Sequence, residues 1–310
     1  MDGLLLVDKP AGPTSHDVVE RMRIVLRERR VGHTGTLDPA ATGLLPLVLG
    51  RATRLARFLS AGDKRYEAAI RLGISTATGD ADGEPAGPPY TGPRPSRDAV
   101  DRALDAFRGT FSQRPPAFSA KRIAGRRSYT LARRARVNAD PGAGLVQAAA
   151  VIVTAHRIDL VSYENDTITV RLDCSAGFYV RSLANDLGSR LGTGAHVTML
   201  RRTRSGACSV DDAIALADAE QHPARAASSI VPMSCMLADW SSVILTAEGV
   251  RRAVSGRDVG PADIQDASEP GRRTGAARGL VRLVDAAGEL VGVGAPSSTP
   301  GLLHPSVVLR

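Results

Sequence analysis

The residue best placed to do chemistry in this 310-residue chain is Asp38, which lies in the segment GHTGTLDPAATG from Gly32 to Gly43. The segment holds three glycines and a proline and has no apolar periodicity, so it predicts a loop. Pro39 disfavours helical geometry at the residue before it, which indicates that Asp38 lies on extended backbone. An isolated Asp-Pro pair is more often only a turn. The surrounding residues must therefore decide whether this carboxylate is functional.

The sequence lacks the motifs of several common kinds of active site. None of the lysines lies in a Gly-x-x-x-x-Gly-Lys-Ser/Thr loop, and no Gly-x-Gly-x-x-Gly follows a strand pattern, so ATP and NAD sites are not expected. The six histidines lack metal-ligand spacing, and no Gly-x-Ser-x-Gly elbow occurs. The widely spaced Cys174, Cys208 and Cys235 indicate reduced structural thiols. We predict neither a cofactor nor a metal.

The charge of the chain is positive and unevenly distributed. The formal net charge is +8, and eight positive charges with no Asp or Glu lie between Arg114 and Arg136. Phe118, Tyr129 and Pro115-Pro116 interrupt this run, as in loops that contact nucleic acid. A solvated surface is the alternative interpretation. If the insertion at about 114–136 binds RNA, the residues expected to contact the phosphate backbone are Lys121, Arg122, Arg126, Arg127, Arg133 and Arg134.

The elements that must position these residues alternate irregularly along the chain. The expected strands are Gly3 to Val7, Leu44 to Leu49, Tyr66 to Leu72, Val146 to Val161, Thr167 to Cys174 and Val197 to Leu200. The expected helices are one capped by Ser15, Thr53 to Leu59, one capped by Ser96, Phe178 to Leu191 and Asp211 to Ala219. A turn at Glu164-Asn165-Asp166 joins two of the strands in a hairpin, and Thr76 to Pro95 is a surface loop. The pattern predicts an α+β fold with a mixed, largely antiparallel sheet.

The last part of the chain has the character of a small separate module. Two short strands, Leu280 to Asp285 and Glu289 to Val293, follow a polar segment from Gln265 to Gly279 that we expect to be a flexible loop. We therefore predict a catalytic domain over residues 1–238 and a β-rich module over 239–310. Neither a run of roughly 18 apolar residues nor a secretory signal is present, so we expect a cytoplasmic protein with no membrane contact.

The loop around Asp38 strongly resembles the signature of the TruB-type tRNA pseudouridine synthases, from Gly32 to Leu45. The resemblance covers residues 3 to about 205 in order, and its other parts are LLLVDKP at 4–10, DKRY at 63–66, Thr76 to Gly83, CSAGFYVR at 174–181 and GAHV at 194–197. Phe178 departs from the pattern, because the family more often has a small hydroxyl residue there. The segments Gly279 to Leu283 and Gly292 to Gly294 resemble the family's PUA-type RNA-binding module.

The resemblance implies a pseudouridine synthase-type catalytic core that isomerises uridine to pseudouridine at position 55 in the T-loop of tRNA. The reaction needs no cofactor, and the expected partner is the T-arm of tRNA, bound by a monomer. Asp38 would be the catalytic carboxylate, since breaking a glycosidic bond generates positive charge at C1′ that a carboxylate stabilises or traps. Arg181 would lie nearby and favour the charged form of Asp38.

The resemblance also assigns residues to the handling of the base, which must leave the RNA stack before Asp38 reaches its sugar. His33 would occupy or open the gap that the flipped base leaves. Tyr66 would lie against the uracil and assist proton removal from C5, and Tyr179 and Leu200 would line the pocket.

Two rival interpretations remain open from the residues themselves. A non-catalytic RNA-binding or tRNA-folding protein would need only the arginine-rich segment and the C-terminal module, but it leaves the Asp38 loop unexplained. A hydrolytic nucleosidase that uses Asp38 at C1′ would release free uracil, which a pseudouridine synthase does not.

Overall fold

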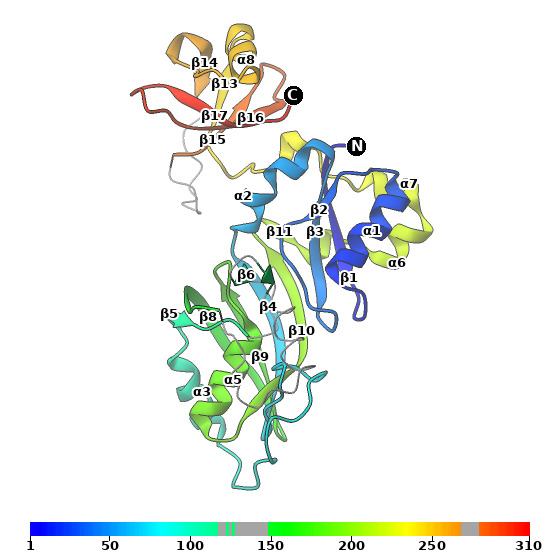
Figure 1. Ribbon diagram of the computed structural model, residues 1–310, viewed down its shortest axis with the longest axis vertical. Coiled ribbons are helices and arrows are strands. Elements are labelled where there is room, and N and C mark those ends of the chain that lie inside the picture. Colours follow the sequence, from blue (N-terminus) through cyan, green and yellow to red (C-terminus); the bar gives the residue numbers. More distant parts are fainter. Residues whose placement is uncertain (117–121, 124–125, 128–147, 268–278) are drawn as a thin grey trace. The chain divides into compact units, whose positions relative to one another are not determined.

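The computed structural model describes residues 1–116, 122–123, 126–127, 148–267 and 279–310 (Figure 1). The chain divides into two compact units. Unit 1 comprises Met1–Gly35, Leu44–Gly62 and Gly206–Arg310, and unit 2 comprises Thr36–Gly43 and Asp63–Ser205. The division at residue 238 into a catalytic domain and a C-terminal module is a different partition, and it stays a prediction.

Unit 2 is built on an antiparallel sheet, and two helices among its described residues pack against it (Figure 1). Its strands, in spatial order, are β10 (Ala195–Ser205), β4 (Lys64–Leu72), β9 (Thr167–Cys174), β8 (Val151–Glu164) and β5 (Gly109–Gln113). The helices are α3 (Arg97–Asp105) and α5 (Val180–Leu191). On β4, Tyr66, Ala68, Ile70 and Leu72 are buried while the residues between them are more exposed, which confirms the predicted alternation. The hairpin of β8 and β9 also forms as predicted.

Unit 1 begins with the predicted first strand, β1 (Gly3–Lys9), which pairs in parallel with β12 (Ile214–Ala215). Next to β1 lies β3 (Thr42–Leu49), the first two residues of which belong to unit 2, and β3 pairs with β2 (Val31–His33). The helical elements up to residue 235 are α1 (Ser15–Leu26), η1 (Gly50–Leu55), α2 (Ala56–Ser60), η2 (Val210–Asp212), α6 (Leu216–Gln221), α7 (Pro223–Ser228) and η3 (Met233–Cys235).

Two expectations for unit 1 were wrong. Thr14, not Ser15, caps α1, because the Thr14 side chain accepts from the Asp17 amide while the Asp17 carboxylate accepts from the Thr14 amide. The helix expected from Asp211 to Ala219 is broken, because Ile214 and Ala215 are extended and pair with β1. Its first two residues lie in the short 3-10 helix η2, and its C-terminal part forms α6.

The C-terminal residues of unit 1 form a five-stranded sheet with the order β14-β13-β15-β16-β17. The elements are β13 (Ser242–Leu245), α8 (Ala247–Val254), η4 (Pro261–Asp263), β14 (Ile264–Ala267), β15 (Val281–Val284), β16 (Leu290–Pro296) and β17 (Leu303–Val308). Strands β15 and β16 confirm the two predicted strands. The expected loop from Gln265 to Gly279 begins inside β14, and residues 268–278 lie outside the described part of the chain.

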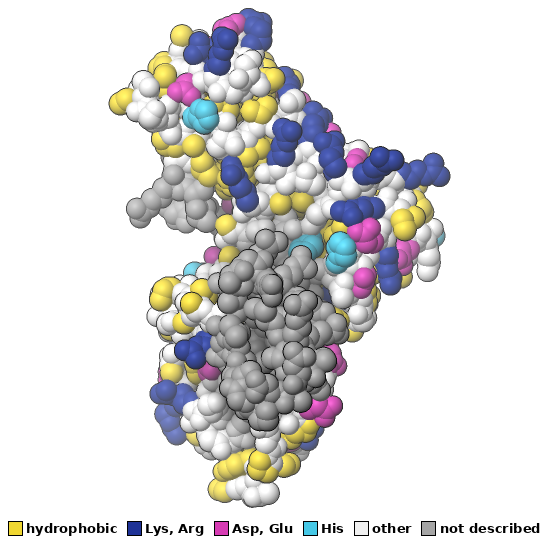
Figure 2. Space-filling view, viewed as in Figure 1, with side chains coloured by type: hydrophobic (Ala, Val, Ile, Leu, Met, Phe, Trp, Pro, Cys, Tyr) yellow, Lys and Arg dark blue, Asp and Glu magenta, His cyan; other side chains and the backbone are white. Residues whose placement is uncertain are grey.

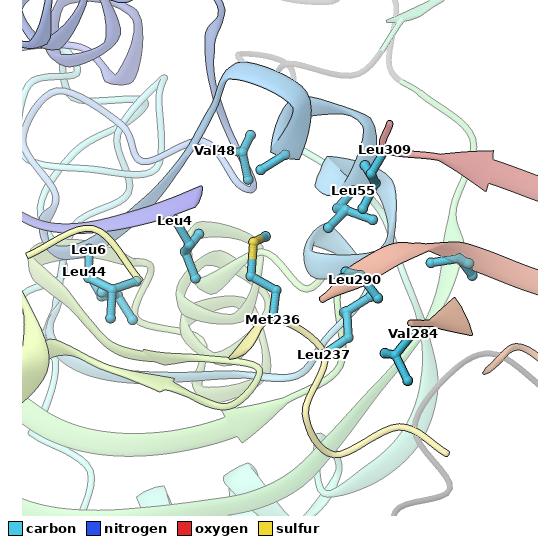
Figure 3. Close-up of a cluster of buried hydrophobic side chains, with 12 residues drawn as sticks. Leu4, Leu6, Leu44, Val48, Leu55, Met236, Leu237, Val284, Leu290 and Leu309 are labelled. Atoms are coloured by element: carbon cyan, nitrogen blue, oxygen red, sulfur yellow. The ribbon is translucent and has the colours of Figure 1, made fainter. Parts of the chain in front are cut away.

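The N-terminal and C-terminal strands of unit 1 share one buried apolar cluster (Figure 3). Leu4 and Leu44 from β1 and β3 belong to the same cluster as Val284 and Leu290 from the C-terminal sheet and Leu309, which follows β17. Polar contacts reinforce this packing, since the Arg51 guanidinium donates to the Leu309 carbonyl at 3.0 Å. Deleting the C-terminal sheet would therefore expose apolar side chains of the N-terminal strands.

The three cysteines are free and differ in exposure, and this difference gives a test of the fold. Burial raises the pKa of the Cys174 thiol to about 12, so only about one part in ten thousand is thiolate at pH 8. Cys235 is exposed. We expect a thiol-specific reagent at pH 8 to modify Cys235 in the folded protein and Cys174 only after unfolding, as read by peptide mass spectrometry. Modification of Cys174 as fast as Cys235 would contradict the burial of β9.

Candidate active site

Asp38 lies on a loop of unit 2 that is held by packing and hydrogen bonds before and after it. The buried Leu37 precedes it, and the Ala41 amide donates to the Asp38 carbonyl at 3.1 Å to close a turn. At the end of the loop, Gly43 pairs with Arg202 of β10. Gly43 has a φ of 98°, and a Cβ there would lie 2.3 Å from the Arg202 carbonyl oxygen. Only glycine permits this approach, so the predicted loop is held close to β10.

The Asp38 carboxylate forms an ion pair with Arg181. Arg181 Nη2 lies 2.9 Å from Asp38 Oδ2, and Arg181 is in the first turn of α5. The side chain of Arg181 is 8% exposed, whereas that of Asp38 is 39% exposed. A buried cation thus holds a carboxylate whose other side stays open to a reactant, and charge-assisted bonds of this kind are strong and directional.

The second arm of the Arg181 guanidinium is held by the loop before α3. Arg181 Nη1 donates to the Thr78 carbonyl at 2.9 Å and lies 3.6 Å from Asp80 Oδ2. The Thr78 hydroxyl donates to the Asp80 carboxylate, which keeps that carboxylate oriented. The sequence analysis did not single out Asp80, which lies in the segment from Thr76 to Pro95 that was expected to be a surface loop. Its place in the segment Thr76 to Gly83, which carries part of the family resemblance, was the one signal for it.

Contacts with β10 fix the position of this loop. The Val197 amide donates to the Gly79 carbonyl at 3.0 Å, and the buried His196 ring nitrogen Nδ1 lies 2.9 Å from the Ile74 carbonyl oxygen. β10 therefore supports both segments that meet at Arg181, because it also pairs with the end of the Asp38 loop.

A buried glutamine at the end of β5 holds the start of α5. The Gln113 side chain accepts from the Tyr179 amide at 2.8 Å and donates to the Tyr179 carbonyl at 3.0 Å. The Ser182 hydroxyl donates to the Arg114 carbonyl at 2.8 Å. These bonds fix the backbone that carries Tyr179 and Arg181, and nothing in the sequence pattern had indicated a role for Gln113.

Gln113→Ala removes the side chain that bonds the part-buried amide and carbonyl of Tyr179, of which the carbonyl also accepts from the Leu183 amide. We expect the free energy of unfolding to fall by about 1–3 kcal/mol, because unsatisfied buried polar groups are costly. Chemical denaturation measures this change. Gln221→Ala, at an exposed position at the end of α6, is the matched control and should change the free energy by less than about 0.5 kcal/mol. Equal effects of the two variants would contradict the structural role of Gln113.

Tyr66 on β4 lies directly across from Arg202 on β10. Tyr66 is 9% exposed, and burial raises the pKa of its phenol. Arg202, which hydrogen-bonds the hydroxyl, lowers the pKa and offsets part of that shift, whereas the nearby charge of Asp38 raises it. The phenol therefore keeps its proton at neutral pH.

The structure brings together some of the predicted site residues. Asp38 and Arg181 form an ion pair in unit 2, the charge of Asp38 acts on the buried Tyr66, and Tyr179 lies two residues before Arg181. The Leu200 carbonyl lies 3.5 Å from the Thr42 hydroxyl at the end of the Asp38 loop. His33 belongs to unit 1, where its Nδ1 accepts from the Gly35 amide at 3.4 Å.

The residues predicted to contact the RNA backbone are only partly described. Arg122, Arg126 and Arg127 lie on a two-stranded hairpin of β6 (Arg122–Ile123) and β7 (Arg126–Arg127). Lys121, Arg133 and Arg134 lie outside the described residues. In the described parts of the chain no cluster of three or more His, Cys, Asp or Glu could hold a metal ion, and no helix there is long and apolar enough to cross a membrane.

Comparisons with known proteins place the chain in a family. A family model described as the TruB family pseudouridylate synthase N-terminal domain matches residues 23–180, and one described as the tRNA pseudouridylate synthase B C-terminal domain matches residues 181–237. The chain belongs to the TruB family of tRNA pseudouridine synthases. It is therefore an isomerase that forms pseudouridine in tRNA.

Named relatives of this TruB-family enzyme agree. It is 40% identical over 311 residues to tRNA pseudouridine synthase B of Solibacter usitatus, which covers all of both chains. It is 46% identical over 227 residues to the protein of that name from Aromatoleum aromaticum, covering 73% of this chain and 70% of the other. A chain of the solved structure titled "Crystal Structure of a Cbf5-Nop10-Gar1 Complex" has a TM-score of 0.73 and 26% identity, covering 99% of this chain and 85% of that one. The predicted α+β fold of the pseudouridine synthase type is thus confirmed.

Proposed function

We propose that this TruB-family enzyme acts on uridine 55 in the T-loop of tRNA and that Asp38 is its catalytic carboxylate. The observation that carries the proposal is the ion pair of 2.9 Å between a nearly buried Arg181 and a half-exposed Asp38. A carboxylate held by a fixed cation on one side and open on the other is suited to attack or to stabilise a reacting sugar or base.

The isomerisation exchanges bonds without loss of atoms. The bond from N1 to C1′ breaks, the uracil rotates while it is held, and C5 bonds to C1′; the proton on C5 leaves and N1 gains one. Asp38 mediates this by attack at C1′ or at C6 of the uracil. Arg181 orients the carboxylate, and Tyr66 lies against the uracil and assists the removal of the C5 proton.

The base must first leave the RNA stack, and this step involves the remaining predicted residues. His33 fills or opens the gap left by the base, while Tyr179 and Leu200 line the pocket that receives it. Both pocket side chains are partly exposed, so a substrate can reach them. These three assignments, with that of Tyr66, follow from the family resemblance.

The surface charge of unit 1 favours a polyanionic substrate. Exposed arginines lie along and after α1 and on η1 and α2, and they are Arg21, Arg27, Arg29, Arg30, Arg54 and Arg57. On the face drawn in Figure 2, this unit presents many Lys and Arg side chains and fewer acidic ones. Such a surface attracts RNA through its phosphates and makes the affinity dependent on salt. The predicted contacts from Lys121, Arg122, Arg126, Arg127, Arg133 and Arg134 would add to this attraction.

The experiment that tests the proposal is a single-turnover reaction with a T-arm hairpin. We expect pseudouridine at the position that corresponds to 55 and no free uracil. Free uracil would indicate the nucleosidase, and tight binding without product would indicate a non-catalytic RNA-binding or tRNA-folding protein. Light scattering of the same sample should show a monomer, and fractionation of cells should find the enzyme in the cytoplasm.

A further inference from the structure

Arg202 of β10 is an arginine that the reaction scheme above does not use. Its side chain is only 1% exposed, and it is the largest of the fully buried side chains described. Burying a guanidinium is unfavourable unless it is paired and hydrogen-bonded. Arg202 must therefore be held by groups of the surrounding structure, and two of them belong to the candidate active site.

The two groups are the Asp38 loop and Tyr66. Arg202 Nη1 donates to the Thr36 carbonyl at 3.4 Å, two residues before Asp38. Tyr66 lies directly across the sheet from Arg202, and the charge of the guanidinium and a hydrogen bond from it lower the pKa of the Tyr66 phenol. One buried cation thus connects the loop of the carboxylate with the phenol on β4.

The chemistry of the two groups fixes the direction of this bond. A guanidinium has only donors, so the Tyr66 oxygen accepts from Arg202. The phenol keeps its own proton, because burial raises the pKa of Tyr66 and makes ionisation unfavourable. The hydroxyl proton of Tyr66 cannot point at the guanidinium, because the guanidinium has no acceptor. It must point toward another group around the phenol. Asp38 is a candidate, because its charge acts on Tyr66.

We propose that Arg202 is a positioning residue that fixes the direction of the Tyr66 hydroxyl beside the Asp38 loop. The proposal rests on the proposed function, because it assumes that Tyr66 and Asp38 act on the same base. Arg202 touches no reacting atom. Its effect on the reaction is transmitted through Tyr66.

A double-mutant cycle tests this route. Arg202→Met keeps an unbranched side chain but removes the hydrogen-bond donors. We expect its single-turnover rate constant on the T-arm hairpin to fall about 30-fold or more. Its RNA affinity should change less than about threefold. In the Tyr66→Phe background, Arg202→Met should lower the same rate constant less than about threefold, because the hydroxyl that Arg202 positions is already absent. Arg204→Met, on the same strand with an ion pair of 3.6 Å to Asp173, is the control and should stay within about threefold of the unsubstituted rate.

Two results with the same variants would overturn the proposal. Equal rate losses from Arg202→Met with and without the Tyr66 hydroxyl would mean that Arg202 acts only on the fold. An unchanged rate would also overturn it. A hairpin that the unsubstituted enzyme does not convert would refute the proposed function instead, and the two failures are thereby distinguished.

A measurement on the unsubstituted enzyme covers the case in which Arg202→Met does not fold. In protein labelled on tyrosine, the Tyr66 ring signal is assigned by its loss in Tyr66→Phe. We expect a nuclear Overhauser effect between the Tyr66 ring and guanidinium protons of an arginine, and a shift of the Tyr66 signal in Arg202→Lys. The absence of that nuclear Overhauser effect would overturn the proposal without any variant of Arg202.

Discussion

Asp38→Asn is expected to lower the single-turnover rate constant for pseudouridine formation at least about a thousandfold and to leave RNA affinity nearly unchanged. The substitution keeps the size of the side chain and its hydrogen-bonding reach, but it removes the charge that must attack or stabilise the substrate. The carboxylate is 39% exposed, so the exchange needs no repacking of a core. The loss should therefore fall on the chemical step.

The measurement for Asp38→Asn is conversion of a T-arm hairpin, read by chemical mapping of pseudouridine, beside a filter-binding titration with the same RNA. Asp82→Asn provides the matched control, because Asp82 is an exposed acid in the same unit, two residues from Asp80. It should react at the unsubstituted rate. Product from Asp38→Asn at even a tenth of that rate would end the assignment of Asp38 as the catalytic carboxylate.

Arg181→Met is expected to have the second largest effect, a loss of about a hundredfold or more in the same rate constant. It removes the partner of Asp38 at 2.9 Å and leaves Asp80 and the Thr78 carbonyl without their guanidinium contact. Arg181→Lys should recover only part of the activity, since a single ammonium cannot take the place of both arms of a planar guanidinium.

The control for Arg181 is Arg190→Met, an exposed position in the last turn of α5. It should leave the rate unchanged. Thermal unfolding of all three variants separates a loss of chemistry from a loss of structure. If folded Arg181→Met reacted within about tenfold of the unsubstituted rate, the ion pair would not be part of the catalytic machinery.

The sequence predicted those features that local patterns determine. The alternation on β4, the hairpin turn at Asn165 and the irregular backbone around Asp38-Pro39 each depend on neighbouring residues, and all three are present. The pairing of Asp38 with Arg181 was also expected, but only from the resemblance to a family. No spacing between positions 38 and 181 could have indicated that contact.

The features that sequence reasoning missed depend on contacts between distant segments. Gln113 holds the backbone of Tyr179 from 66 positions away, and Asp80 approaches Arg181 from another loop. No sequence pattern singled out Arg202, and arginines are rarely buried. β10 is longer than the predicted strand Val197 to Leu200, since the residues that extend it are mostly polar and show no apolar alternation. Tertiary pairing decides these cases.

The most direct test of the central claim is a map of pseudouridine in tRNA from cells that lack this gene. The account predicts that pseudouridine at position 55 is absent, that the unsubstituted gene restores it, and that the gene for Asp38→Asn does not, although the variant protein is present at the same level. Pseudouridine at position 55 in cells without the gene, or its restoration by Asp38→Asn, would contradict the account.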